Sequence, residues 1–428
     1  MFESASRLKL RLLCTPATPV ADLLTHSPPL PLIVALQCHV LRSTKAQEDT
    51  LFALQHADRV VSISVNPWCS EDSEMLMALD RAFPTLKALS LSNQDGRSVV
   101  LPGNFVAPHL RTLHLRSVAV SAVSSLLTKA IANLISLRLE RMQASSYVHP
   151  EHLAKLISSI PRLEHLSIGF MPLSPFKTKE TWHPQVTRAV LHNLRSLTYT
   201  GGCAYLEKLL ALIGTPLLQL FRVNYFTQRT LALQSLSEFL GTIHDLNFGT
   251  AVISFSGSVT VTYYPTQPSD SLSCLMFSMD NNMHPLKRHI ATMVQICAAT
   301  TPALHAAESL ALEFDRPYVP DGLAARSGLW RALLRSFKTV VTLQSDIALA
   351  PELFGVLNPD DGVETEELLP MLCELTVVSR SRHLYNPFAS FIHARCLAGH
   401  PLTFRVIERR PSPPLSIPRY FDVFECMI

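Results

Sequence analysis

A hydrophobic frame with the spacing L-x-x-L-x-L recurs along the first half of the chain. Its clearest copy is Leu110, Leu113 and Leu115, at the end of the stretch P-H-L-R-T-L-H-L. In an extended segment Leu113 and Leu115 point to one face, and Thr112, His114 and Arg116 point to the other. Further copies begin at Leu86, Leu134, Leu163 and Leu194, and a looser copy begins at Leu218. The pattern predicts a series of short strands, each with one buried face.

The spacing between these frames indicates a repeat architecture. Successive frames begin 24 residues apart in three cases and 29 and 31 residues apart in the other two. Leucine-rich repeats have periods of about 20 to 29 residues. Between frames the apolar residues follow helical spacing, as in the segment bounded by Pro150 and Pro161, where each proline suits a helix end. We therefore predict an α/β leucine-rich-repeat solenoid, a curved horseshoe with parallel strands on its concave face and helices on its convex face.

The strength of the pattern varies along the chain and predicts five segments. Residues 1–45 are expected to form an N-terminal cap with the first strand, and residues 46–225 the regular repeats, including a helix around residues 123–131. Residues 226–300 are expected to hold irregular repeats, with two strands on either side of Ser256-Gly257-Ser258. Residues 301–408 return to regular repeats. The charged, proline-rich tail at 409–428 is expected to blunt the open end of the solenoid.

Composition and charge narrow the classes of function. The chain has 428 residues, of which 47% are hydrophobic and 17% charged, so it is too apolar to be disordered. Lys and Arg number 37 against 34 Asp and Glu, and no long single-sign block occurs. A nucleic-acid or anionic-lipid partner normally requires clustered basic residues. No apolar run reaches the roughly 18 residues of a membrane span. We expect neither a nucleic-acid partner nor a membrane association.

The cysteine pattern favours a reducing compartment. Nine cysteines are scattered along the chain without a C-x-x-C pair, and buried reduced cysteine behaves as a small apolar residue. No N-x-Ser/Thr glycosylation site occurs, and the first residues lack the order of a secretory signal. The expected location is the cytoplasm or the nucleus.

Motifs for catalysis or metal binding are weak. The closest groupings are His149, Glu151 and His152, and a second set at His393, Cys396 and His400. Neither has the C-x-x-C or H-E-x-x-H spacing that places ligands around one ion. The chain also lacks a G-x-S-x-G elbow and the glycine loops that hold phosphates. We expect no metal, no cofactor and no enzymatic activity. A Ser, His and Asp assembled from distant positions stays open as an alternative.

The strand residues that point away from the leucines form the candidate binding surface. An extended groove with a few arginine anchors suits a protein or peptide ligand, although the same residues could be ordinary solvated positions. The candidate residues are Thr112, His114, Arg116, Ser136, Arg138, Glu140, His165, Ser167 and Arg222.

Several stretches resemble a known family. They include A-P-H-L-R-T-L-H-L from Ala107, I-P-R-L-E-H-L-S-I from Ile160 and F-E-S-A-S-R-L-K-L-R-L-L from Phe2. The P-P-L-P-L run from Pro28 and A-Y-L-E-K-L-L from Ala204 belong to the same set. Together they resemble the repeat region of fungal F-box and leucine-rich-repeat proteins of mushroom-type basidiomycetes.

The resemblance implies a substrate-recognition subunit of a cullin-RING ubiquitin ligase, in which F-box helices hold the adaptor and the repeats hold the target protein. No position in this sequence matches an F-box, which would precede the repeats. We therefore expect adaptor binding only if an F-box precedes this chain, and otherwise a bare interaction module. The alternative is a leucine-rich-repeat scaffold or receptor domain with no ubiquitin role.

Overall fold

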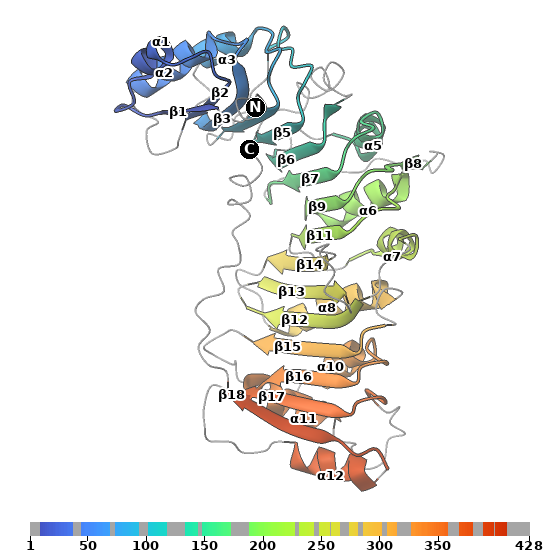
Figure 1. Cartoon of the computed structure of the whole chain (residues 1–428). Coiled ribbons are helices and arrows are strands. Elements are labelled where there is room, and N and C mark those ends of the chain that lie inside the picture. Colours follow the sequence, from blue (N-terminus) through green and yellow to red (C-terminus); the bar gives the residue numbers. More distant parts are fainter. Residues whose placement is uncertain are drawn as a thin grey trace, which may run out of the picture. The chain divides into compact units, whose positions relative to one another are not determined.

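Figure 1 shows the computed structural model of the whole chain. The chain forms two compact units. The first unit comprises Met1–Leu246 and Ser269–Met279, and the second comprises Asn247–Pro268 and Asp280–Ile428. The residues that the structure describes are 9–36, 44–68, 73–93, 102–117, 133–143, 148–172, 188–226, 231–243, 248–256, 258–265, 274–280, 286–301, 306–314, 327–357, 368–379, 388–397 and 399–408. The predicted helix around 123–131 and the predicted tail at 409–428 lie outside them.

The first unit is built on a parallel sheet whose strands follow one another in chain order. Its strands are β1 (Leu10–Cys14), β2 (Leu32–Leu36), β3 (Val60–Trp68), β4 (Ala88–Asn93), β5 (Thr112–Arg116), β6 (Ser136–Met142), β7 (His165–Phe170), β9 (Ser196–Gly201), β11 (Leu220–Tyr225) and β14 (Cys274–Asp280). A small separate sheet pairs β8 (Ala189–Val190) with β10 (Ile213–Gly214). Parallel neighbours require a crossover, and most of these crossovers carry a helix.

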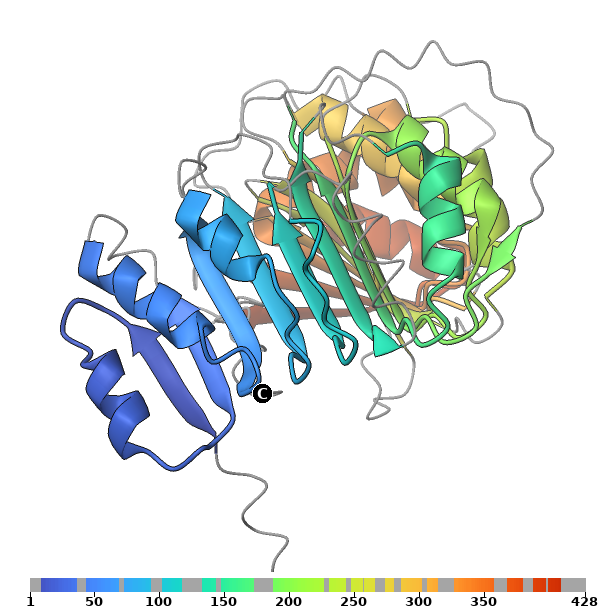
Figure 2. The same cartoon turned by 90° about the horizontal axis from the view of Figure 1, so that it is seen from above.

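The described helices of the first unit are α1 (Val20–His26), α2 (Thr44–Leu54), α3 (Ser73–Leu79), α5 (Pro150–Ser158), α6 (Cys203–Leu212) and α7 (Gln234–Gly241). Figure 1 shows α5, α6 and α7 stacked on one side of the strands, and Figure 2 shows the same stack, in green, from above. Their apolar stripes face the sheet; Leu153 and Ile157 of α5, for example, are fully buried.

The frame leucines form one continuous internal ladder. Leu89, Leu113, Leu137, Leu166 and Leu197 are matched residue to residue across five neighbouring strands. Each is at most 1% exposed. A single strand and helix cannot bury their apolar faces alone, so this stacking supplies the core. The predicted leucine-rich-repeat architecture is therefore confirmed.

Polar side chains next to four of the frames tie a repeat to the one before it. Asn133 precedes frame residue Leu134 and donates to the Pro108 carbonyl at 3.0 Å. Asn193 precedes Leu194 and donates to the Pro161 carbonyl at 2.7 Å. Thr85 and Thr339 occupy the same position and donate to Asp58 and Ala307. These bonds fix the turn before each of these four strands onto the preceding turn, and the apolar pattern alone did not predict them.

The second unit departs from the parallel arrangement at its first hairpin. Strands β12 (Phe248–Phe255) and β13 (Ser258–Pro265) confirm the two strands predicted around residues 256–258, but they pair antiparallel. The hairpin is thus a local departure from the parallel pairing, within the segment predicted to hold irregular repeats. The connection between the two strands is far too short for the crossover that a parallel pair needs.

The rest of the second unit continues in parallel. β12 pairs with β15 (Ser309–Phe314), followed by β16 (Thr342–Asp346), β17 (Glu374–Ser379) and β18 (Thr403–Glu408). Its helices are α8 (Leu286–Ala299), α10 (Ser327–Leu334), α11 (Ala350–Leu357), α12 (Ala389–Leu397) and a 3-10 turn at Ile347–Leu349. Within the described residues, neither unit contains a helix that is both long and apolar enough to cross a membrane.

Candidate functional site

The face of the first unit's sheet opposite the leucine ladder carries every predicted binding residue. We call it the strand face. Thr112, His114 and Arg116 lie on β5, and Ser136, Arg138 and Glu140 on β6. His165 and Ser167 follow on β7, and Arg222 lies on β11. All of them are partly or fully exposed, whereas the leucines between them are buried. The alternation of strand side chains therefore places the nine residues on one surface.

The strand register aligns part of this set in a straight row. His114 is matched with Arg138, Arg138 with Ser167, and Ser167 with Thr198. Thr198 is in turn matched with Arg222. We call these five residues the central row. Arg138 and Arg222 thus lie three strands apart, and only two small hydroxyl side chains occupy the matched positions between them.

A chain of polar contacts crosses one end of the central row. Ser90 Oγ on β4 lies 3.3 Å from His114 Nδ1, a hydrogen bond between neighbouring strands. On the other side of the ring, His114 Nε2 lies 3.3 Å from Oε2 of Glu140 on β6. The two side chains are 17% and 31% exposed, so water screens this contact only in part. The contacts hold the imidazole between two strands in one orientation.

The charges around Glu140 favour its ionised form. The hydrogen bond from His114 lowers the pKa of Glu140, and the nearby Arg138 and Arg116 lower it further, while burial opposes the shift. Glu140 is therefore a carboxylate near neutral pH, held by the groups around it. Its negative charge is offset within the cluster by the two arginines.

His165 contributes polarity rather than charge. Burial lowers its pKa, and the positive charges of Arg138 and Arg195 act in the same direction, while Glu164 opposes them. A histidine whose pKa falls below its ordinary value is neutral near pH 7. The permanent positive charges that the predicted residues bring to the strand face are those of Arg116, Arg138 and Arg222.

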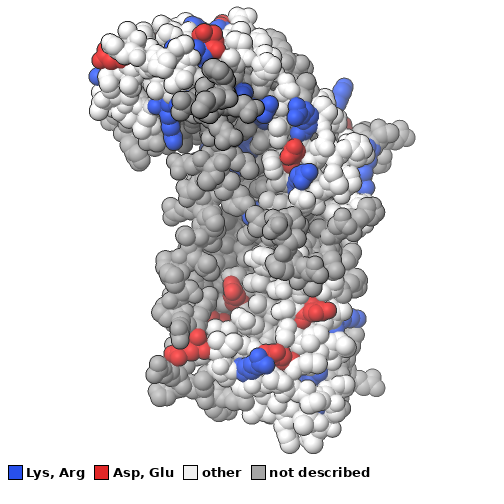
Figure 3. All heavy atoms as spheres, viewed as in Figure 1, with Lys and Arg blue, Asp and Glu red and all other residues white. Residues whose placement is uncertain are grey.

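Charge is mixed over the side of the molecule drawn in Figure 3. Blue Lys and Arg and red Asp and Glu are scattered among uncharged residues in its described part. The excess of arginine on the strand face is a local feature and does not reflect the composition of the chain, whose formal net charge is +3.

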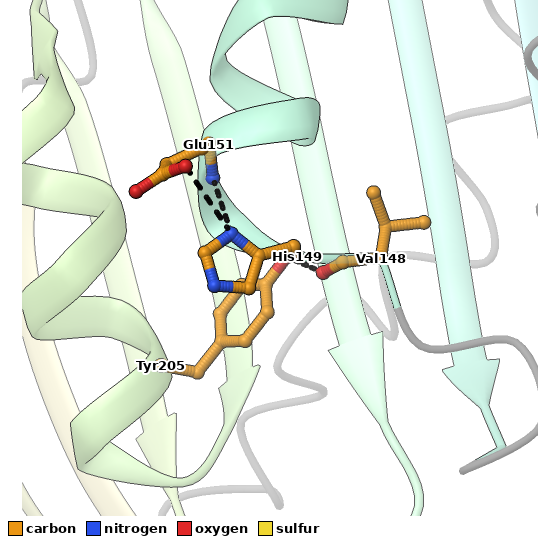
Figure 4. Close-up of polar contacts among 4 residues, drawn as sticks. All are labelled: Val148, His149, Glu151 and Tyr205. Carbon is orange, nitrogen blue, oxygen red and sulfur yellow. Dashed lines mark hydrogen bonds and ion pairs between the residues drawn. The ribbon is translucent and has the colours of Figure 1, made fainter. Parts of the chain in front are cut away.

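The first histidine grouping singled out in the sequence serves as a helix cap. His149 precedes α5, and its Nδ1 accepts a hydrogen bond from the backbone N–H of Glu151 at 3.4 Å. The same nitrogen lies 3.8 Å from Glu151 Oε2, as Figure 4 shows. Tyr205 Oη, from α6, donates to the Val148 carbonyl at 2.9 Å and fixes the entry to this helix. The grouping thus satisfies an N–H group at the start of α5.

The second grouping lies at the end of α12. The backbone N–H of Gly399, with φ +82°, donates to the Cys396 carbonyl, and His400 N–H donates to the Arg395 carbonyl. These bonds close the helix C-terminus. Within the described part of the chain, no three His, Cys, Asp or Glu side chains are placed to hold a metal ion.

Two buried thiols are poor candidates for a nucleophile. Burial raises the pKa of Cys203 and of Cys297 to about 12. Cys203 Sγ also donates to the Ala232 carbonyl at 2.9 Å. Because the thiolate is the reactive form, both groups are inert near neutral pH. The raised pKa values of these two thiols follow from their position in the core and not from a catalytic role.

Comparison with known proteins identifies no family for the chain. No protein-family model matches it, and no curated protein matches it either. Among solved structures, it is similar to the chain described as "Crystal structure of TLR13-ssRNA13 complex", with a TM-score of 0.38 and 13% sequence identity. The match covers 93% of this chain and 48% of that chain, so the present chain spans about half of that protein's length. The repeat assignment therefore stands on the strand register and the leucine ladder.

Proposed function

We propose that the strand face of the first unit binds an extended, acidic segment of a partner protein. The observation that carries this proposal is the central row, which aligns polar, partly exposed side chains across adjacent strands. The nine predicted residues include three arginines and a single acidic residue, Glu140, which is already held by His114. The surplus of positive charge favours a negatively charged ligand.

The chemistry of the row suits carboxylates. An arginine guanidinium forms paired, charge-assisted hydrogen bonds with a planar carboxylate. Partial burial strengthens such contacts because screening by water is reduced. The small side chains of Ser167 and Thr198 leave the surface between Arg138 and Arg222 low, so that a ligand backbone can approach the sheet.

Blocking the row tests this proposal. Ser167→Trp places a large side chain at its middle, and Lys155→Trp is the control, since Lys155 is exposed on α5 on the helix side of the sheet. We expect a labelled Asp- and Glu-rich peptide to bind the parent protein and the control in fluorescence anisotropy, and to lose binding to Ser167→Trp. Equal binding to all three proteins, or equal binding of a Lys-rich peptide, would refute the proposal. Stronger competition by single-stranded polyuridine than by the acidic peptide would assign the face to nucleic acid instead.

The resemblance to F-box proteins supports a more specific role. We propose that the protein is the target-recognition part of a cullin-RING ubiquitin ligase of the cytoplasm or nucleus, and that the strand face holds the target. Support comes from the stretches that resemble the family and from a surface suited to a protein ligand. Affinity purification of the endogenous tagged protein tests it. Recovery of a cullin and its adaptor is the expected result, and recovery of targets without them would favour a scaffold with no ubiquitin role.

A further inference from the structure

We propose that the acidic partner presents two carboxylates four residues apart on one side of an extended segment, one against Arg138 and the other against Arg222. This inference rests on the proposed function and adds the spacing that the surface selects. Its basis is the distance that the strand register sets between two arginines whose sequence separation gives no such information.

The register determines this distance. Arg138 is matched with Ser167, Ser167 with Thr198, and Thr198 with Arg222, so the two arginines are three strand steps apart. Neighbouring strands are about 4.8 Å apart, which gives a separation of about 14 Å across the sheet. No strand is bulged at these four positions, because each is a direct partner of the next.

An extended ligand matches this distance at one spacing. A strand rises about 3.3 Å per residue, and every second side chain points to the same side. Residues i and i+4 therefore share a side and lie about 13 Å apart, close to the separation of the two arginines. Residues i and i+3 point to opposite sides. A helical ligand, with its rise of about 1.5 Å per residue, would need roughly nine residues to span the same distance.

The residues between the two arginines accommodate the middle of such a ligand. The side chain at i+2 lies over Ser167 and Thr198, whose hydroxyls can donate or accept hydrogen bonds. Both are only partly exposed and carry no charge. A small polar residue fits there, whereas a third acidic residue at that position would have no arginine to contact. The surface thus distinguishes spaced acidic residues from a continuous acidic run.

Peptides of identical composition test the spacing. Each probe is a short Thr-rich peptide with two Asp residues, at i and i+4 in one peptide and at i and i+3 in the other, because threonine favours extended backbone. We expect the i, i+3 peptide to bind roughly ten- to a hundredfold more weakly, the loss of one charge-assisted contact. Arg138→Gln and Arg222→Gln should each weaken the i, i+4 peptide by a similar factor and abolish the preference for its spacing. Lys155→Gln, on the helix side, should change neither affinity.

A charge exchange provides a second readout. Arg222→Glu should reject the i, i+4 peptide and recover binding when one of its two Asp residues is replaced by Lys. Equal affinity for both spacings, with both still blocked by Ser167→Trp, would overturn the spacing and leave the proposed function intact. Absence of binding by every acidic peptide, or binding that Ser167→Trp leaves unchanged, would overturn the proposed function itself. Circular dichroism of each variant establishes that it is folded.

Discussion

His114 Nε2 lies 3.3 Å from Oε2 of Glu140 on the neighbouring strand, although the two residues are separated by a full repeat in the chain. Because this contact lowers the pKa of Glu140, the folded state favours the carboxylate more than the unfolded chain does. The resulting stability is fully present above the unfolded pKa of about 4.3 and is lost as the pH falls through the lower folded value. In Glu140→Gln the free energy of unfolding should therefore depend less on pH in this acidic range. Urea unfolding at a series of pH values measures it.

Glu207 offers a comparison of opposite sign. Its pKa is raised, chiefly by burial, although its carboxylate accepts hydrogen bonds from the backbone N–H groups of Ser235 and Leu236 at the start of α7. A raised folded pKa means that its contribution is fully present below the unfolded pKa and is lost as the pH rises through the folded value. Glu207→Gln should thus remove the loss of stability that Glu207 causes as the pH rises through its folded pKa. If both variants changed the pH profile in the same direction, the assignment of these shifts would be wrong.

The two faces of β5 should respond very differently to substitution. Leu113 is 0% exposed and lies in the leucine ladder, so Leu113→Asp would bury a charge without a partner and should prevent folding. His114→Ala, at the next position, removes a partly exposed ion-pair contact and should cost about 1 kcal/mol or less. Thermal melts of the two variants measure this difference. Equally mild effects would contradict the position of the ladder.

Gly201 is required by close packing at the end of β9. A Cβ atom built there would lie 2.5 Å from Tyr199 Oη and 2.9 Å from the Phe170 ring. Gly201→Ala should therefore destabilise the first unit by about 1 to 3 kcal/mol, because the aromatic side chains must shift. Gly241→Ala, at the end of α7, is the control, since nothing lies within 4 Å of its Cβ position. Chemical unfolding compares the two, and an equal loss from both would rule out the packing explanation.

The bonds between turns should contribute measurably to stability. Asn193→Ala removes the 2.7 Å hydrogen bond to the Pro161 carbonyl and should cost about 1 kcal/mol in urea unfolding. Asn193→Asp keeps the size of the side chain but cannot donate, so it should lose as much or more. An aspartate variant as stable as the parent protein would show that the donated bond contributes nothing.

Thiol reactivity should separate the described cysteines by depth. Cys373 and Cys396 are exposed, whereas Cys203 and Cys297 are buried and have pKa values raised to about 12. Iodoacetamide at mildly alkaline pH should label the exposed pair in the folded protein and reach the buried pair only after denaturation. Peptide mass spectrometry measures the extent of labelling at each cysteine separately. Early labelling of Cys297 would indicate that the second unit opens readily.

The sequence by itself determined the repeat, because alternation along a strand is a local property. The spacing of Leu113 and Leu115 fixes which side chains share a face, and the recurrence of that spacing predicts a ladder whatever the connections do. The pattern alone therefore placed all nine candidate residues on one face of the sheet, opposite the leucines. Pro150 and Pro161 marked the limits of the helix between them, α5 (Pro150–Ser158), for an equally local reason.

Only the tertiary structure decided which residues of that surface meet. The contact between His114 and Glu140, and the three strand steps from Arg138 to Arg222, depend on the register between repeats. The length of each crossover and the irregularities within strands set that register, as at Arg141, whose φ of +52° coincides with a register shift in β6. Cross-strand neighbours are chosen by the whole fold, whereas the face on which a side chain lies is chosen by its own strand.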